Sequence, residues 1–224
     1  MELRDLVWHY RQELLSGLMM TLLLTALASA AGLIVGLGLA IAAKRLKWIA
    51  RAVGLLSLAW LSIPVIVLLY WAHFPLQDAL GIVVVPFYTA TMVLSVVNVC
   101  AVYQLIAPAL RSFPRELLYT ARVLGLSERE ITWRIVFPIL LRQLGPALIQ
   151  SQLALVHLTL LASFISVPEL FRVVQRITAQ ERGSSVEVYT GMALLFALSV
   201  GPIAYITSKA HARLSREFVP QLPR

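Results

Sequence analysis

Charged residues are scarce in this chain. Lys, Arg, Asp and Glu make up 13% of its 224 residues, whereas they account for about 25% of an average soluble domain. Hydrophobic residues make up 59%, and the mean hydropathy is +0.82. This composition excludes an ordinary soluble domain and indicates an integral membrane protein. The single cysteine, Cys100, cannot form a disulfide within the chain. The length accommodates five or six spans of about 20 residues and leaves no room for a separate catalytic domain.

Five stretches of the sequence contain no charged residue at all. Each one reaches the roughly 20 residues that a helix needs to cross a bilayer core about 30 Å thick. The longest stretch, 79–110, contains Pro86 and Pro108, and we expect its helix only over 87–106 because proline removes a donor and clashes one turn back. The sequence therefore predicts a single-domain, all-α integral membrane fold over residues 1–224, with spans at about 14–43, 52–75, 87–106, 143–168 and 188–208.

The segments between these stretches alternate in charge. Their net charges are +4, +3 and +3 for residues 44–51, 111–142 and 209–224, and −1, −1 and 0 for residues 1–13, 78 and 169–187. The positive-inside rule places the first group in the cytoplasm, so the N-terminus lies outside and the C-terminus inside. The overall charge of +8 thus reports topology. Because the basic residues are spread over three segments without interleaved aromatics, they do not indicate a nucleic-acid partner.

The cytoplasmic segment 111–142 is longer than a simple connection between two spans requires. We expect two short helices, the first beginning near Pro114 and ending at Gly125. Ser127 and Glu130 form an S-x-x-E capping box that begins the second helix. Periodicity alone leaves two interpretations open, docking onto a partner or lying on lipid headgroups. An apolar stripe runs along the first helix: Leu117, Leu118, Ala121 and Leu124.

The run Ala121 to Ser127 reads ARVLGLS, and Phe137-Pro138 with Leu141-Arg142 follows it. This pattern resembles the cytoplasmic "EAA" loop of ATP-binding-cassette importer permeases, in which E-A-A-x-A-L-G-x-S precedes a hydrophobic-Pro-x-x-Leu-Arg segment. The chain departs from the pattern at Tyr119, which stands where the family has its glutamate. Glu116, one turn earlier, would then supply the carboxylate.

Other segments resemble the polar amino-acid branch of that family, the permeases for histidine, glutamate, glutamine and arginine. Gly17 to Leu22 looks like its G-x-x-x-T-L pattern in the first helix. The run His157 to Leu161, followed by Glu169-Leu170, looks like its K-D-T-S-L segment and the residues after it. Glu187-Val188-Tyr189 matches an E-x-Y at the last helix.

The resemblance implies a permease subunit in the bacterial cytoplasmic (inner) membrane that forms the path for a small polar solute, an amino acid in this branch. It implies ATPase subunits, a second identical or homologous permease and an extracytoplasmic solute-binding protein as partners. ATP and Mg would be bound by the ATPase partners, so we expect no cofactor and no catalytic residue in this chain. The first short helix of the loop would be the coupling helix, with Glu116, Leu117, Leu118, Ala121, Leu124, Gly125 and Ser127 as coupling residues.

Polar side chains within the spans must face other helices or a water-filled path, because lipid cannot satisfy them. They are Asn98, Gln104, Gln150, Gln152, His157 and Thr159. We expect Asn98, Gln152, His157 and Thr159 to line the translocation path, with His157 standing where the resembled family has a lysine. The alternative is that they join helices, at about 1 kcal/mol or less per contact. The other histidines lie in separate segments, so no metal site is expected.

Residues 169–187 predict a short helix after Pro168. Leu170, Val173, Val174 and Ile177 have helical spacing on one face, and Arg172 and Arg176 lie on another. A position in the bilayer interface explains this pattern most simply. The resemblance implies an alternative, which is contact with the solute-binding protein.

Two other functions fit a hydrophobic chain. One is a stand-alone secondary transporter or channel, but such folds often contain inverted repeats, which five unequal spans do not show. The other is a purely structural membrane subunit, which leaves the two-helix cytoplasmic segment unexplained.

Overall fold

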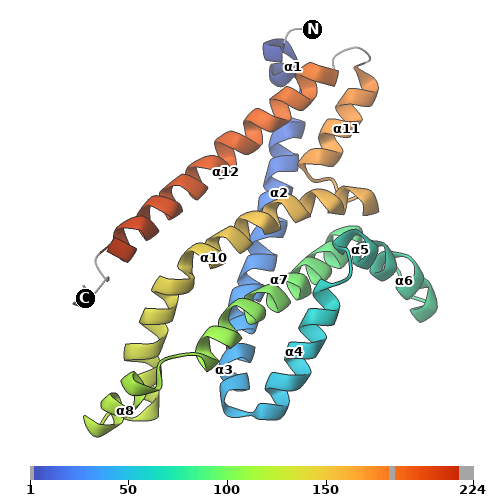
Figure 1. The fold of residues 1–224 in the computed structure, drawn as a ribbon. Helices are drawn as coiled ribbons and strands as arrows, with labels where there is room; N and C mark the ends of the chain where they lie inside the picture. The colour runs from blue at the N-terminus through green and yellow to red at the C-terminus, as the bar shows by residue number, and fades with distance from the viewer. Residues whose placement is uncertain (1–2, 182–184, 217–224) are drawn as a thin grey trace.

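The computed structural model describes residues 3–181 and 185–216, and the regular structure within them is helical. Figure 1 shows α2, α7 and α10 crossing at the centre, with α8 at one end of the molecule and α1 and α11 at the other. The elements are α1 Leu3–His9, α2 Arg11–Ala31, η1 Gly32–Gly36, α3 Leu37–Arg45, α4 Lys47–Leu61, α5 Val65–His73, α6 Pro75–Leu80, α7 Pro86–Arg111, α8 Arg115–Val123, α9 Glu128–Glu130, η2 Ile131–Val136, α10 Phe137–Thr159, η3 Leu160–Ile165, α11 Leu170–Gln180 and α12 Ser185–Arg216.

Three helices in the described part of the chain are long and apolar enough to cross a membrane. They are Arg11–Lys44, Pro86–Arg111 and Glu128–Ile165. A fourth span results if the bent pair Lys47–Leu61 and Val65–Leu80 is counted as one. The last predicted span, 188–208, lies within α12, whose apolar part among the described residues is the shorter Val186–Leu198.

The segment predicted as the second span, 52–75, is not one unbroken helix. The chain turns by 93° between α4 and α5, and the break lies at Ser62–Pro64. Pro64 has no N–H to continue the helix, and its ring disfavours the helical conformation of the residue before it. The helix therefore restarts at Val65, and α5 packs against α7 and η3.

The third span is longer than predicted. Pro86 occupies the first turn of α7, where a missing N–H costs nothing. The helix then continues through Pro108 to Arg111, although we expected it to end at 106. Pro108 stands in the last turn, so it removes one hydrogen bond near an end that would fray in any case, and the Ser112 N–H closes that turn on the Pro108 carbonyl at 2.9 Å.

The fourth span also begins earlier than predicted. The second helix of the cytoplasmic segment is not a separate short element, because α9, η2, α10 and η3 form one helix from Glu128 to Ile165. This helix ends at Ser166, which adopts a left-handed conformation with φ +69°. Pro168 follows, and the chain then enters α11, so the predicted separation of α11 from the span is confirmed.

The central helix of the fold is α7, which packs against α2, η1, α3, α4, α5 and α10. Close approach to the first span depends on glycines in η1. A Cβ added at Gly32 would lie 2.1 Å from Nδ2 of Asn98, and one at Gly36 would lie 2.9 Å from Cβ of Val102. The first span therefore touches α7 through its bare backbone at these two positions.

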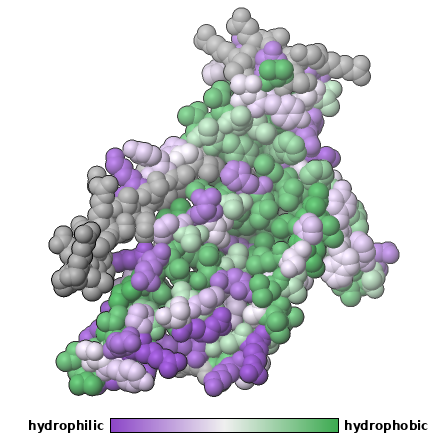
Figure 2. Space-filling model, viewed as in Figure 1, coloured by the Kyte–Doolittle hydropathy of each residue, from purple (hydrophilic) through white to green (hydrophobic). Residues whose placement is uncertain are grey.

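One end of the molecule differs in polarity from its middle. Figure 2 shows hydrophobic residues over much of the middle of the visible face and hydrophilic residues gathered at the end that carries α8 and the connection from α3 to α4. Hydrophobic surface exposed along the helices is what a bilayer-embedded chain requires.

Candidate functional site

The helix α8 begins after Pro114 and divides its apolar residues between two faces. Ala121 is buried and Leu118 packs against the cluster that contains Ile131 and Val136. In contrast, Leu117 and Leu124 are 45% and 74% exposed. Half of the predicted stripe thus holds α8 on the molecule, and the other half faces outward. Tyr119, Val123, Glu116 and Ser127 are also exposed.

The turn after α8 has the predicted chemistry. Gly125 has φ +79°, a conformation that glycine adopts without the penalty of a Cβ. The capping box is present: the Glu130 N–H donates to the Ser127 hydroxyl, and the Ser127 N–H donates to the Glu130 carboxylate. An ion pair of 2.6 Å between Arg122 and Glu128 crosses the turn, and Glu128 raises the pKa of Arg122. The helix–Gly–helix geometry is therefore locally determined.

Two of the four residues predicted to line a path meet in the middle of the molecule. The buried Asn98 donates from Nδ2 to the carbonyl of Ala28 and to Oε1 of Gln152, both at 3.0 Å. Gln152 donates back to Oδ1 of Asn98 at 3.3 Å. Gly32 makes room for the amide, as its hypothetical Cβ would collide with it. These contacts join α2, α7 and α10.

The other two residues lie apart from this pair. Thr159 is buried and donates to the carbonyl of Val156 at 2.7 Å, within its own helix. His157 is exposed on the surface of the chain. A further polar residue of the spans, Gln104, joins α7 to α4 by donating to the Gly54 carbonyl at 3.0 Å and to the Ser57 hydroxyl at 2.6 Å. Among the four residues predicted to line the path, only Asn98 and Gln152 are hydrogen-bonded to each other in the described part of the chain.

A second polar network lies where the bent arm of α5 and α6 meets α7. Nε2 of Gln77 donates to the Thr89 hydroxyl at 3.0 Å and lies 3.1 Å from Nδ1 of His73. Oε1 of Gln77 accepts the Val84 N–H at 2.8 Å. Sequence reasoning missed it because Gln77 flanks Asp78 in what reads as a short loop. The spacing of four between His73 and Gln77 was the available signal. In residues 3–181 and 185–216, no three His, Cys, Asp or Glu side chains are grouped to hold a metal ion.

The motifs at Gly17, Thr21 and Glu169 form one contact between α2 and α11. Glu169 is fully buried, and its carboxylate accepts the N–H groups of Phe171 and Arg172 at 2.9 and 2.7 Å, which caps α11. The Thr21 hydroxyl accepts the Leu170 N–H at 3.2 Å. Burial raises the pKa of Glu169 to about 7, against the opposing effect of these hydrogen bonds.

The apolar face of α11 is the predicted one. Leu170, Val173, Val174 and Ile177 are buried against α2 and α12. Arg172 and Arg176 are exposed, and Arg176 forms an ion pair with Glu13. The face that we assigned to the bilayer interface is thus covered by protein, because α2 and α12 bury it.

Comparison with known proteins identifies the family. The family model described as "Binding-protein-dependent transport system inner membrane component" matches residues 32–219. The chain belongs to this family. It is therefore an inner membrane component of a transport system, and the alternatives of a stand-alone transporter and a purely structural subunit are set aside.

Curated relatives of this membrane component match over almost their whole length. The glutamine transport system permease protein GlnP of Escherichia coli (strain K12) is 26% identical over 210 residues, covering 93% of this chain and 95% of the relative. A probable glutamine ABC transporter permease protein GlnP of Bacillus subtilis (strain 168) is 25% identical over 215 residues, covering 94% and 97%. The homologues are thus permease subunits of ABC transporters.

Solved structures share the fold. The chain superimposes with a TM-score of 0.79 on an amino acid ABC transporter crystallised with histidines, at 21% identity, covering 97% of this chain and 99% of the other. An inward-facing form of the methionine ABC transporter MetNI gives 0.69 at 20% identity, covering 94% and 98%. The fold of these permeases is therefore shared over more than nine-tenths of the chain.

Proposed function

We propose that this chain is the permease subunit of an ATP-binding-cassette importer for a small polar solute, specifically an amino acid. The observation that carries the proposal is the family match combined with α8, whose outward face presents Leu117 and Leu124 beside a fixed glycine turn. The amino-acid assignment is supported by the relatives, which are named for glutamine, and by the amino acid transporter that shares the fold.

The proposed topology has five spans in one domain over residues 1–224, with the N-terminus outside and the C-terminus in the cytoplasm. The bent pair α4–α6 would form the second span and α12 the fifth. Support comes from the alternation of loop charge. Further support is the clustering of hydrophilic residues at the end that carries α8 (Figure 2).

Coupling to ATP hydrolysis would occur at α8. Two separate ATPase subunits would bind ATP and Mg, and their closure would draw the coupling helices of two permeases together. The other permease is either a second copy or a homologue. Ala121 and Leu118 would transmit the movement, because they fix α8 to the cluster under η2 and α10. Leu117, Leu124 and Glu116 would face the ATPase, while Gly125 and Ser127 would hold the turn. This movement would switch the spans from an inward-open to an outward-open state, and each ligand would shift the balance between these two states only through its differential affinity for them.

Solute would pass beside the polar cluster of Asn98 and Gln152. Thr159 and the exposed His157 would contribute to the path only where a second permease completes it, because Thr159 donates within its own helix and His157 lies on the surface of this chain. Replacing His157 with Ala should reduce uptake while the complex still assembles, since the role is contact with the path and not packing. Uptake at the normal rate by this variant would contradict the role of His157.

At the outer end, α11 would contact a solute-binding protein. An open hollow of about 600 Å³ lies beside it, and Arg172, Gln175 and Arg176 are among the residues that line it. Exposed guanidinium groups there would suit an acidic surface on the binding protein.

Co-purification with the ATPase subunit tests the coupling assignment. Leu124→Glu places a charge on the outward face of α8 without disturbing the buried face, so we expect loss of ATPase binding and uptake with normal membrane insertion. Val83→Glu is the matched control, because Val83 is fully exposed in the turn before α7. If Leu124→Glu and Val83→Glu both retained the ATPase and full uptake, α8 would not be the coupling helix.

A further inference from the structure

We propose that this permease binds an anionic phospholipid where α3, α4 and α7 meet. The phosphate would occupy a basic hollow, and one acyl chain would lie in an adjoining apolar groove. This inference rests on the proposed topology, which places this end of the molecule at the cytoplasmic headgroup layer.

The basic hollow collects cations from separate stretches of the chain. It is open, has a volume of about 580 Å³ and contains no acidic residue in its lining. Its five cationic residues are all exposed, and none of the ion pairs among the described residues includes them. These residues are Lys44, Lys47, Arg51, Arg111 and Arg115.

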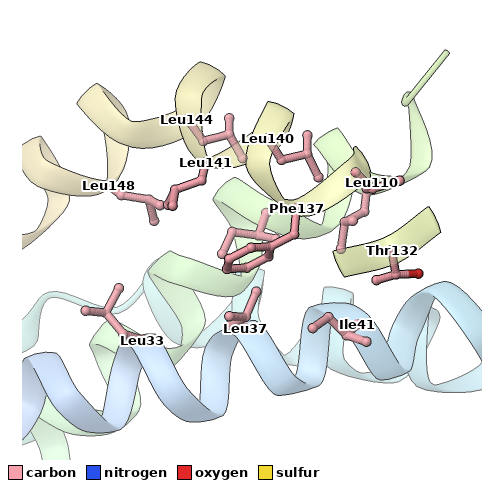
Figure 3. Close-up of a pocket in the computed structure, with 12 residues that line it drawn as sticks. Leu33, Leu37, Ile41, Leu110, Thr132, Phe137, Leu140, Leu141, Leu144 and Leu148 are labelled. Carbon is pink, nitrogen blue, oxygen red and sulfur yellow. The ribbon is translucent and has the colours of Figure 1, made fainter. Parts of the chain in front are cut away.

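The apolar groove lies between the first span and the fourth. Figure 3 shows Leu33, Leu37 and Ile41 on one side, with Phe137, Leu141 and Leu148 on the other. Its volume is about 220 Å³, and Thr132 is the one polar residue among the twelve that line it. Such a lining suits a hydrocarbon chain.

The hollow and the groove adjoin. Leu110 lines both, and Arg111 follows it on α7. Ile41 of the groove and Lys44 of the hollow are three residues apart on α3, so they lie on the same face of that helix. A ligand with an anionic head and an apolar tail matches this order of surfaces, whereas a free phosphate uses only the hollow.

The positive-inside rule explains why cytoplasmic segments are basic, but it does not explain this convergence. The rule concerns the number of cations in a loop. It does not require cations from α3, α4, α7 and α8 to line one hollow beside an apolar groove. Each cation near an anionic headgroup strengthens binding about fivefold, so several converging cations distinguish an anionic lipid from a zwitterionic one.

Native mass spectrometry of the purified full chain in detergent tests the proposal, with phosphatidylglycerol, phosphatidylcholine and inorganic phosphate as separate probes. We expect phosphatidylglycerol to bind at least tenfold more tightly than phosphatidylcholine. The Lys44→Gln/Lys47→Gln variant should lose about 25-fold in affinity for phosphatidylglycerol at low salt. The charge-matched control Arg129→Gln/Lys209→Gln changes two exposed cations outside the hollow and should bind as the natural chain does.

The acyl-chain half of the site has its own variant pair. Leu141→Ser alters the groove, and Leu58→Ser alters an exposed leucine on α4 away from it. We expect only Leu141→Ser to weaken phosphatidylglycerol binding, by several-fold, with inorganic phosphate binding unchanged. Elution of each variant in size-exclusion chromatography at the natural position shows that it is folded.

Equal binding of the two lipids would overturn the proposal, as would equal losses in test and control variants. Complete competition by inorganic phosphate at the affinity of the lipid would assign the hollow to free phosphate. If Lys44→Gln/Lys47→Gln kept lipid binding but lost the ATPase subunit, the hollow would be a protein-docking surface. Because the assay needs no ATPase, a chain that prefers phosphatidylglycerol but binds no ATPase would contradict the proposed function alone.

Discussion

At the scale of single residues, Glu169 stands out as a buried carboxylate with a raised pKa. Its carboxylate is buried where α11 begins, and it caps that helix through two backbone N–H groups. Capping favours the ionised form, but burial outweighs it and raises the pKa of the carboxyl to about 7. The group therefore binds a proton more tightly in the folded chain than in the unfolded one.

This difference predicts a pH dependence of stability. The contribution of Glu169 to the free energy of unfolding is fully present below its ordinary pKa of 4.5 and is lost as pH rises through about 7. The resulting decrease in the free energy of unfolding is on the order of 3 kcal/mol. Thermal unfolding of the purified chain between pH 5 and 8.5 measures it. Glu169→Gln keeps a cap acceptor without a titrating group, so its melting temperature should vary less with pH. If the melting temperatures of the natural chain and of Glu169→Gln changed equally with pH, Glu169 would not titrate in this range.

Residue patterns predicted the turn chemistry of the candidate site but only part of its polar contacts. Gly125, Ser127 and Glu130 behave as predicted because their interactions are local in sequence. Asn98 and Gln152 are 54 residues apart and join only when three helices pack. His157 could not be placed from the sequence, because its exposure depends on which face of α10 the other helices cover.

At the scale of elements, close packing between α2 and α11 depends on Gly17. A Cβ at this position would lie 2.9 Å from Cγ2 of Val173 and 3.0 Å from the Cα of Leu170. The second atom belongs to the backbone, so it cannot move aside as a side chain tip can. Gly38 is also helical, yet a Cβ there meets nothing within 4 Å.

Alanine at these two glycines should therefore have opposite effects. Gly17→Ala should destabilise the chain by about 1–3 kcal/mol through overpacking. Gly38→Ala should be neutral or stabilise by roughly 0.5–1 kcal/mol, because alanine loses less backbone entropy in a helix. Melting temperatures of the two variants in detergent provide the comparison. Similar destabilisation by both would mean that helix contact at Gly17 is not tight.

Element boundaries were predicted least well where proline is involved. Pro108 does not end α7, because it lies in the last turn, whereas Pro64 divides a span that hydropathy presents as continuous. Hydropathy measures the apolar length of a segment and not its direction, so the 93° turn had no signal other than the proline itself. The apolar face of α11 was visible from its spacing, but its burial by α2 and α12 was not.

At the scale of the whole molecule, the proposed topology places residue 83 outside and residue 123 in the cytoplasm. Val83 and Val123 are 100% and 86% exposed, so cysteine at either position should react freely. In a Cys100→Ala background, a membrane-impermeant maleimide should label Val83→Cys in intact cells, and Val123→Cys only after permeabilisation. Labelling of both positions in intact cells, or the reverse pattern, would exclude the alternation inferred from loop charge.

The two π-helical segments, Gly32–Gly36 and Ile131–Val136, are positions where the loss of one residue during evolution would be tolerated. A π turn holds one residue more than an α-helical turn closed around the same axis. Loss of one residue from either segment would let the helix revert to α geometry while both flanking halves kept their faces. Single-residue gaps between this permease and its relatives should therefore concentrate in these two short segments, whereas elsewhere in the same spans a one-residue gap would rotate half a helix away from its partners.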